Sequence, residues 1–439
     1  MSRCHYNSLS TEIMWILVIL NVIFHVTVNA KTTISIGVLF DVKSLRHHGT
    51  LFASLAEVNH HDPTINLRPV IATVDISDSF AISNAMCDLI SQDVIVILGI
   101  TNVSSLSTIQ SYSNTFNVPF ISIGSTHNYT LSSPFQMFMR PAYMGAVFDV
   151  IELYQYRKAV YVYDTDEGLM RLQDVFQYIN TRELLVDLDV RRVTELGQLS
   201  DLIQFSKYDD QLILVMILDI SKLDIKEIVQ YLNKHVVAGA RLHLVTVTLD
   251  QLLVNNILPN EDIELNVTGF QLVPPDSKQD TETMTIFPDT FQGELMSSSD
   301  ALISDCIKLI RMAVEMSEQQ EWFPRLWSSF PSTFQRTTAK CSNFVVDKKP
   351  YGSLFMEYLA RVYFYGKTGT VALDDWFKRR NFLLGVYQYR NGNRALKLGV
   401  WSPDLGLKIA SQVQDKTYTL IVNASRYSNI VPPLLLYKK

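Results

Sequence analysis

Short apolar runs alternate with helical segments along the chain from Ile34 onward. This alternation predicts βαβ units, because neighbouring parallel strands need a long connection that a helix supplies. The runs are apolar at successive positions, as expected when helices cover both faces of a sheet. The first series is expected to contain strands at 34–40, 67–74, 94–98 and 119–123, with helices that begin at Leu51, Phe80 and Val103.

The same pattern restarts after Arg140-Pro141, which predicts a second lobe. The next helix has an apolar face with helical spacing, formed by Met144, Val147, Phe148 and Ile151. A later helix, 168–181, is expected to turn four residues inward: Leu169, Leu172, Phe176 and Ile179. The other elements of this series are strands at 159–163, 184–190, 211–218 and 243–246 and a helix at 225–233. Two short extended stretches, 269–273 and 366–370, are expected to be further crossings between the lobes.

The composition is that of an ordinary globular chain. Of its 439 residues, 47% are hydrophobic and 19% are charged, which is enough for two or three domain-sized cores. The formal net charge of −6 argues against nucleic acid or an anionic membrane as a partner, because binding phosphate requires a concentrated basic surface.

Residues 1–30 have the pattern of a secretory signal peptide, with an apolar core from Met14 to Val28 and a small-residue cleavage site that ends at Ala30. A signal anchor is the alternative, but Asn21 and His25 interrupt the apolar run. No later stretch of the sequence approaches about 18 uninterrupted apolar residues, the length that spans a bilayer. We therefore expect the chain to enter the secretory pathway and to lie on the extracellular side of the plasma membrane.

Four N-x-[ST] sequons predict glycosylated surface loops in such a protein, at Asn102, Asn128, Asn266 and Asn423. The sequence has four cysteines, and Cys4 lies in the predicted signal peptide, so one of the remaining three must stay unpaired within the chain. Cys306 lies on a helix of apolar periodicity, which favours a buried free thiol.

Residues that could carry catalysis or bind a metal give only weak signals. His47-His48 and His60-His61 flank a predicted helix, without a carboxylate or cysteine at ligand spacing, so we expect solvated histidines. Asp164 and Asp166 lie in a strand-to-helix loop, where we expect a solvated acidic pair. Gly366-Lys367-Thr368 imitates the end of a P-loop, but Arg361 stands where its first glycine would be. We therefore expect no enzyme, no metal and no cofactor.

Three pieces between Ser133 and Gln177 resemble one family. They are MRP at 139–141, ELYQYRKAVYVYD at 152–164 and DEGL at 166–169, and together they resemble the amino-terminal domain of AMPA-type ionotropic glutamate receptors. Further similar segments lie at 78–99, 266–273, 350–353, 366–369 and 398–402. The resemblance therefore covers nearly the whole chain after residue 30.

The resemblance implies an α/β fold, a two-lobed periplasmic-binding-protein-like (type I, LIVBP-like) clamshell of two doubly wound parallel sheets. It implies an amino-terminal domain at 31–410, with lobe 1 at about 31–139 and 274–366 and lobe 2 at about 140–273 and 367–410. Residues 411–439 resemble a linker and the first strand of an incomplete agonist-binding domain, so this chain alone is not expected to form a channel. At Phe377 the family usually has a glycine, and we expect another turn type because a bulky residue resists a positive φ.

The family also pairs the cysteines that match Cys87 and Cys341, so the resemblance implies this disulfide. It implies a domain that mediates subunit assembly, pairing with itself or with homologous subunits through lobe 1 and contacting extracellular synaptic proteins. Phe80 begins a helix whose core face is already occupied, by Ile82, Ala85, Met86 and Leu89. We therefore expect the Phe80 ring at the dimer interface.

A ligand of two such lobes would lie in the cleft between them, beyond the carboxyl ends of the strands. Ser125, Thr126 and Tyr163 follow or end predicted strands there and could hold an amino-acid carboxylate. Because the corresponding cleft in the family is not thought to hold an agonist, and the Asn128 sequon lies in the same loop, we expect no small-molecule ligand. The competing interpretation is an amino-acid-sensing domain, like those of class C G-protein-coupled or natriuretic-peptide-type receptors.

Overall fold

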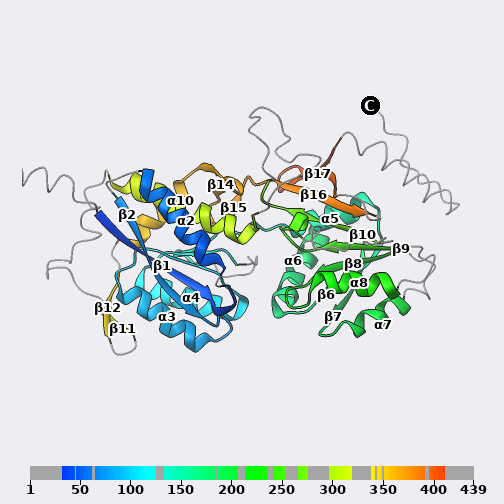
Figure 1. The fold of residues 1–439 in the computed structure, drawn as a ribbon, viewed down its shortest axis with the longest axis horizontal. Helices are drawn as coiled ribbons and strands as arrows, with labels where there is room; N and C mark the ends of the chain where they lie inside the picture. The colour runs from blue at the N-terminus through cyan, green and yellow to red at the C-terminus, as the bar shows by residue number, and fades with distance from the viewer. Residues whose placement is uncertain are drawn as a thin grey trace, which may run out of the picture.

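The computed structural model describes residues 32–44, 46–61, 65–124, 133–183, 185–205, 213–235, 241–253, 265–274, 296–318, 338–341, 344–348, 351–390 and 395–410. The predicted signal peptide (1–30) and the segment 411–439 lie outside these residues. Two sheets with helices packed around them lie side by side (Figure 1). The strands predicted in both series are present, with ends shifted by a few residues.

The first sheet is parallel throughout and has five strands in the order β2-β1-β3-β4-β5. Its strands are β1 (Thr32–Asp41), β2 (Ile65–Val74), β3 (Ile97–Gly99), β4 (Phe120–Ser122) and β5 (Gln136–Phe138). The connecting helices are α2 (His47–His61), α3 (Ser79–Ser91) and α4 (Val103–Phe116), and a short 3-10 helix, η1 (Val42–Ser44), follows β1.

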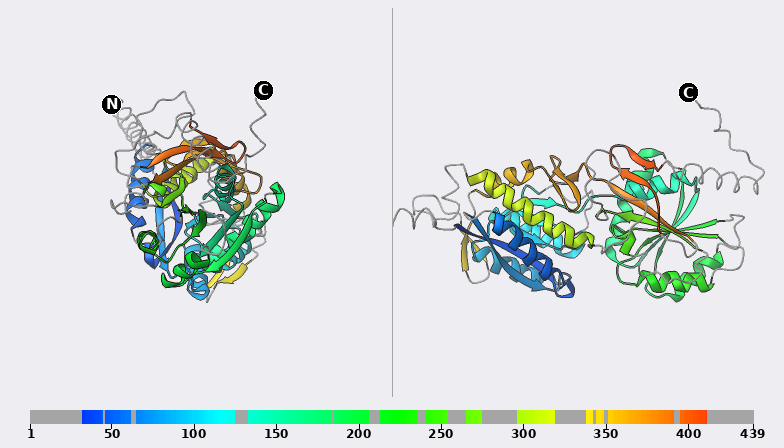
Figure 2. Two further views of the ribbon diagram at one scale, coloured as in Figure 1. Left: turned by 90° about the vertical axis from the view of Figure 1, so that its right-hand side faces the viewer. Right: turned by 45° about the horizontal axis from the view of Figure 1, so that its top comes forward.

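The inner strand β1 is buried on both faces, and its successive side chains point alternately to one face and the other. Ile36 and Val38 pack in one core cluster with Leu51 of α2, whereas Leu39 packs on the other face with Ile82 of α3. Two later helices, α10 (Ser298–Glu318) and α12 (Gly352–Arg361), also pack on this half of the molecule. The second view of Figure 2 shows α10 lying along the half that contains β1. The uniformly apolar strands thus result from helices on both faces, as predicted.

The second sheet has eight strands in the order β18-β17-β16-β10-β9-β8-β6-β7. Its parallel part consists of β6 (Lys158–Tyr163), β7 (Asp187–Arg192), β8 (Ile213–Asp219), β9 (Arg241–Thr246) and β10 (Asn266–Gln271). Three antiparallel strands complete it: β16 (Leu384–Arg390), β17 (Leu396–Ser402) and β18 (Gly406–Ile409). The second sheet is therefore mainly parallel, as the predicted fold class requires, and the returning chain adds hairpin-connected antiparallel strands at one edge.

Four helices accompany the second sheet: α5 (Met144–Leu153), α6 (Asp166–Arg182), α7 (Gly197–Phe205) and α8 (Ile225–His235). The predicted face of α5 is confirmed, because Met144, Val147, Phe148 and Ile151 are all buried. One core cluster joins Val162, Met216 and Leu244 of the sheet to Leu199 of α7 and Ile228 of α8. This half of the molecule therefore also buries the sheet beneath helices.

The inward face of α6 differs from the predicted one. Leu172 is buried as expected, but Leu169 and Phe176 are 43% and 45% exposed. Gly168 and Val175 are buried in their place. The reason is a close tertiary contact between α6 and β6. A Cβ added at Gly168 would stand 2.7 Å from the Cβ of Tyr163. The backbone of α6 can therefore approach β6 this closely only at a glycine.

The stretches expected to be crossings belong to strands instead. Residues 266–271 form β10 of the eight-stranded sheet. The next described helix, α10, packs against α2 beside the five-stranded sheet, so the chain returns to that half of the molecule after β10. Residues 366–370 lie in a three-stranded sheet of β13 (Phe364–Gly366), β14 (Gly369–Leu373) and β15 (Arg379–Arg380), and the chain enters the eight-stranded sheet after β15. A further hairpin consists of β11 (Thr338–Cys341) and β12 (Phe344–Asp347).

The turn at Phe377 adopts the conformation that we expected it to avoid, with φ of 58°. The Phe377 amide donates to the Asp374 carbonyl at 3.0 Å, and Asp374 Oδ1 accepts from the amides of Trp376 and Lys378 at 2.9 and 2.8 Å. The Phe377 ring also packs against the core. These contacts offset the cost of the left-handed region, about 1–2 kcal/mol for a residue with a Cβ, so the expectation of another turn type is wrong.

Candidate functional site

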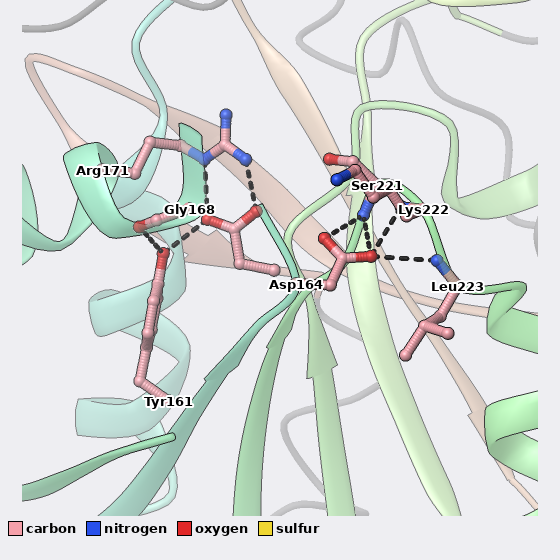
Figure 3. Close-up of polar contacts among 8 residues, drawn as sticks. Tyr161, Asp164, Gly168, Arg171, Ser221, Lys222 and Leu223 are labelled. Atoms are coloured by element: carbon pink, nitrogen blue, oxygen red, sulfur yellow. Dashed lines mark hydrogen bonds and ion pairs between the residues drawn. The ribbon is translucent and has the colours of Figure 1, made fainter. Parts of the chain in front are cut away.

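The two sheets share a strand order that defines where a ligand would bind. In the second sheet β7-β6-β8-β9-β10 repeats the order of β2-β1-β3-β4-β5. In sheets of this order the connection reverses direction beside the first strand, and ligands bind there at the carboxyl ends of the strands. The switch point of the second sheet lies between β6 and β8, where Tyr163 pairs in register with Asp219. Asp164, which directly follows β6, comes to the same edge (Figure 3).

Asp219 is buried and fully engaged by side chains from two neighbouring elements. Arg171 of α6 donates to both carboxylate oxygens, with Nε 2.6 Å from Oδ2 and Nη2 bonded to Oδ1. The Tyr161 hydroxyl of β6 donates to Oδ2 and also lies 3.0 Å from the Gly168 carbonyl (Figure 3). A bidentate arginine is the strongest partner that a carboxylate finds in a protein.

The pKa directions agree with this geometry. Burial raises the pKa of the Tyr161 phenol, and the Asp219 carboxylate raises it further, so the hydroxyl stays a donor. Burial of Arg171 opposes its charge, but Asp219 outweighs burial and the pKa of Arg171 is raised overall. The Arg171 guanidinium therefore stays charged at neutral pH, and the Tyr161 phenol stays neutral.

Asp164 is held by backbone donors. Its carboxylate accepts from the amides of Ser221 at 2.9 Å, Lys222 at 2.5 Å and Leu223 at 2.9 Å (Figure 3). Successive backbone amides of this kind form an anion-binding concavity, and here the chain fills it with its own carboxylate. The expectation of a solvated acidic pair is wrong for Asp164, which is buried, but holds for Asp166, whose exposed side chain pairs with Arg192 at 3.3 Å.

Of the three predicted ligand residues, one packs beside this network and two lie outside the described residues. Ser125 and Thr126 are outside, as are the sequons at Asn128 and Asn423. Tyr163 is buried, and its ring centroid lies 6.3 Å from that of Tyr161 beneath the first turn of α6. Its position favours a packing role. The switch-point residues that sequence reasoning missed are Asp219 and Arg171, because strand order cannot be read from a single sequence.

The corresponding edge of the first sheet is occupied by hydroxyl contacts. Thr101 and Ser122, which follow β3 and end β4, share a hydrogen bond of 2.6 Å. Asn102 caps α4, since its Oδ1 accepts from the Ser105 amide at 2.8 Å while the Ser105 hydroxyl accepts from the Asn102 amide at 2.9 Å. The fourth sequon, Asn266, begins β10 and is half-buried.

The histidines expected to be solvated divide into two kinds. His60 and His61 are exposed, but His47 is buried and its Nδ1 lies 2.6 Å from Asp300 Oδ1. This correction follows from α10, which brings Asp300 against α2 from a distant part of the sequence. Within the described part of the chain, His, Cys, Asp and Glu side chains form no group that could hold a metal ion.

The cysteine pairing is the one that the resemblance implied, and the Phe80 ring lies outside the core face of α3. The Cys87 and Cys341 sulfurs are bonded, with their Cα atoms 5.4 Å apart, and Cys306 is a buried free thiol. The predicted core face of α3 is buried: Ile82, Ala85, Met86 and Leu89. Phe80, in contrast, is 75% exposed.

A pair of α/β sheets with parallel strands and switch points of this order defines a periplasmic-binding-protein-like ligand-binding region. The chain belongs to the family described as the receptor family ligand binding region, whose sequence profile matches residues 50–392. This is a family of receptor regions and not of enzymes, in agreement with the sequence analysis.

Glutamate receptors are among the relatives of this chain. It is 30% identical over 389 residues to a glutamate receptor of Lymnaea stagnalis. It is 24% identical over 391 residues to glutamate receptor 3 of Rattus norvegicus and to that of Homo sapiens. Each match covers 84% of this chain and 41% of the relative, so the chain spans less than half the length of these relatives. In the described ranges, every helix is too short or too polar to cross a bilayer.

Proposed function

We propose that the chain is the extracellular amino-terminal region of an AMPA-type ionotropic glutamate receptor subunit, and that it pairs subunits and contacts extracellular partners. The relatives named glutamate receptor 3 support the AMPA-type assignment. One observation favours assembly over amino-acid sensing. At the switch point of the second sheet, the donors that a ligand carboxylate would need already bind Asp164 and Asp219.

The two halves of the molecule correspond to the two lobes of the proposed domain. The five-stranded sheet with α10 and α12 supports lobe 1 at about 31–139 and 274–366. The eight-stranded sheet supports lobe 2 at about 140–273 and from residue 381 onward. The start expected at 367 is too early, because β14 and β15 precede this sheet and the amides of Lys367 and Thr368 bind Asp305 of α10. Residues 31–410 would then form the amino-terminal domain.

The proposed dimer interface is the exposed side of α3 and α4 in lobe 1. Asp78 caps α3 by accepting from the Phe80 amide at 2.9 Å, which holds the exposed ring at a rigid helix start. The two helices are also joined side by side, since the Ser83 and Tyr112 hydroxyls are hydrogen-bonded. A rigid, exposed aromatic side chain on a pair of packed helices is suited to a two-fold contact, in which the same surface is used by both copies.

The test is analytical sedimentation of the purified chain. We expect a dimer at micromolar concentration and a shift toward monomer for Phe80→Asp, because loss of a buried interface aromatic costs about 2 kcal/mol, a roughly thirtyfold change in dissociation constant per side. The matched control is Phe52→Asp on α2, since Phe52 is 53% exposed in the same half of the molecule. A monomeric wild type, or a Phe80→Asp dimer that is unchanged, would refute the proposed interface.

A further inference from the structure

A pocket of about 230 Å³ lies beside the Asp219 network and is separate from the edge of the first sheet. Three segments line it: the connection from β5 into the start of α5 (Arg140, Tyr143 and Gly145), helix α6 (Arg171, Asp174 and Tyr178) and the end of β17 (Trp401). We call this space the Arg140 pocket. The described residues that line it include none from the five-stranded sheet or its helices, so it is distinct from a cleft between the two sheets.

One aromatic wall of the Arg140 pocket is held in place by a single carboxylate. Asp149 of α5 accepts from the Tyr178 hydroxyl at its Oδ1 and from Trp401 Nε1 at its Oδ2, both at 2.8 Å. Arg182 donates to the same carboxylate at 3.1 Å and lies over the Tyr178 ring, with its Cζ 4.9 Å from the centroid. Because both rings are fixed by hydrogen bonds, a ligand would meet a wall whose orientation is already set.

A glycine packs directly against this wall. A Cβ built at Gly145 would stand 3.0 Å from the Tyr178 ring and 3.1 Å from the Trp401 ring. A larger residue at this helix position would therefore displace the two rings. The glycine allows the start of α5 to pack tightly against Tyr178 and Trp401, so the aromatic wall is supported from this side as well.

The cationic group of the Arg140 pocket is Arg140 itself. Arg171 also lines it, but its charge is matched by Asp219 through two hydrogen bonds. Among the residues that the structure describes, Arg140 forms no ion pair. Tyr143, next to it, is buried, and burial raises the pKa of its phenol, so it remains a neutral donor. The pocket thus combines a half-buried guanidinium with an aromatic wall.

The volume and lining select a class of ligand. An apolar cavity of about 150 Å³ accommodates one benzene molecule, so a pocket of about 230 Å³ has room for one ring and a small polar group. Arginine recognises carboxylates through paired N–H donors. We propose that the Arg140 pocket binds a small aromatic carboxylate, with the carboxylate on Arg140 and the ring against Tyr178 and Trp401.

Glutamate does not fit this description. Its two methylene groups cover much less of the two rings than an aromatic ring would, and its second carboxylate would lie in a pocket that Asp174 also lines. Desolvating a charge without a partner is costly. The Arg140 pocket therefore differs in ligand class from an amino-acid agonist site.

Titration of the full chain with 4-fluorobenzoate, followed by fluorine NMR, tests the proposal. We expect saturable binding that unlabelled benzoate displaces and that glutamate and benzyl alcohol do not. Arg140→Gln should weaken binding tenfold or more, as expected for loss of a charge-assisted hydrogen bond. The matched control is Arg192→Gln, the same charge change at an exposed ion pair on β7, which should leave binding unchanged.

A second variant tests the aromatic wall. Gly145→Val should abolish binding by pushing the Tyr178 and Trp401 rings out of position, while circular dichroism reports whether the fold is kept. The proposal is overturned if benzoate shows no saturable binding up to about 10 mM. It is also overturned if Arg140→Gln and Arg192→Gln bind equally, or if a folded Gly145→Val chain binds like the wild type. None of these results affects the sedimentation test of the dimer.

Discussion

Individual buried carboxylates in this protein differ in the donors that hold them. Asp164 is held by three backbone amides, whereas Asp219 is held by an arginine and a tyrosine. A charge removed from water is tolerated only when its hydrogen bonds are satisfied in this way. Both residues therefore stabilise the join between β6, β8 and the start of α6, and neither is available to a ligand.

Glu167, close to Asp164 and Asp219, is a carboxyl group whose environment disfavours its charged form. Burial raises its pKa above the ordinary value of 4.5, and Arg171 and Arg140 offset this only in part. A raised folded-state pKa means that ionisation opposes folding, so stability is lost as the pH rises from 4.5 through the folded-state pKa. We expect Glu167→Gln to have a higher Tm than the wild type near pH 7 and the same Tm near pH 4.

Thermal unfolding followed by circular dichroism at the two pH values measures this effect. Asp166→Asn is the matched control, because it makes the same chemical change one residue earlier at an exposed side chain. Its Tm should change little, since exposed ion pairs contribute about 1 kcal/mol or less. A Glu167→Gln chain that unfolds at a lower temperature than the wild type near pH 7 would contradict the assignment.

At the scale of elements, helix α4 is preceded by a residue with two roles, one observed in the structure and one predicted from the sequence. Asn102 is both the cap of α4 and the acceptor of a predicted sequon. We expect Asn102→Ala to lower the free energy of unfolding by about 1 kcal/mol, because the Ser105 amide loses its acceptor. Chemical denaturation of unglycosylated protein measures this loss.

A second substitution separates the two roles of Asn102. Ser104→Ala removes the sequon and leaves the cap intact, since the Ser104 side chain is exposed and makes no part of the capping box. In protein secreted from eukaryotic cells it should remove a glycan at Asn102, detected by mass spectrometry, without lowering stability. If Ser104→Ala is as destabilising as Asn102→Ala, the cap is not the cause.

Helix α6 illustrates how an element can be predicted while its orientation is not. Helical periodicity located it, but placed Leu169 and Phe176 inward, where the structure has Gly168 and Val175. A prediction from helical periodicity assigns the largest apolar side chains to the buried face of the helix. The fold instead brings the helix backbone close to Tyr163, and only a glycine permits that approach.

At the scale of the whole molecule, one covalent bond joins distant parts of the sequence. The Cys87–Cys341 disulfide links α3 to β11 across 254 residues. On the chain-entropy model, closing so long a loop stabilises by roughly 5 kcal/mol at most. We expect Cys341→Ser to lower the free energy of unfolding by a few kcal/mol, measured by urea denaturation.

Non-reducing peptide mapping provides the control for this prediction. Cys306 should be alkylated only after unfolding, because its thiol is completely buried. Peptides that join Cys87 to Cys306, or that contain free Cys87, would contradict the pairing. Equal stability of the wild type and Cys341→Ser would show that the bond contributes nothing to the folded state.

The sequence by itself determined the class of fold, because apolar runs separated by helical segments can be buried only as sheets covered by helices. It also located the elements, the core face of α5 and the exposed ring of Phe80, which depend on local periodicity. Tertiary structure alone decided the strand orders, and with them the meeting of Asp164, Asp219 and Arg171 at one edge. It likewise decided the pairing of His47 with Asp300 and the positive φ of Phe377. These features depend on contacts between residues far apart in the chain or on packing against the core, and the pattern of neighbouring residues carries no information about either.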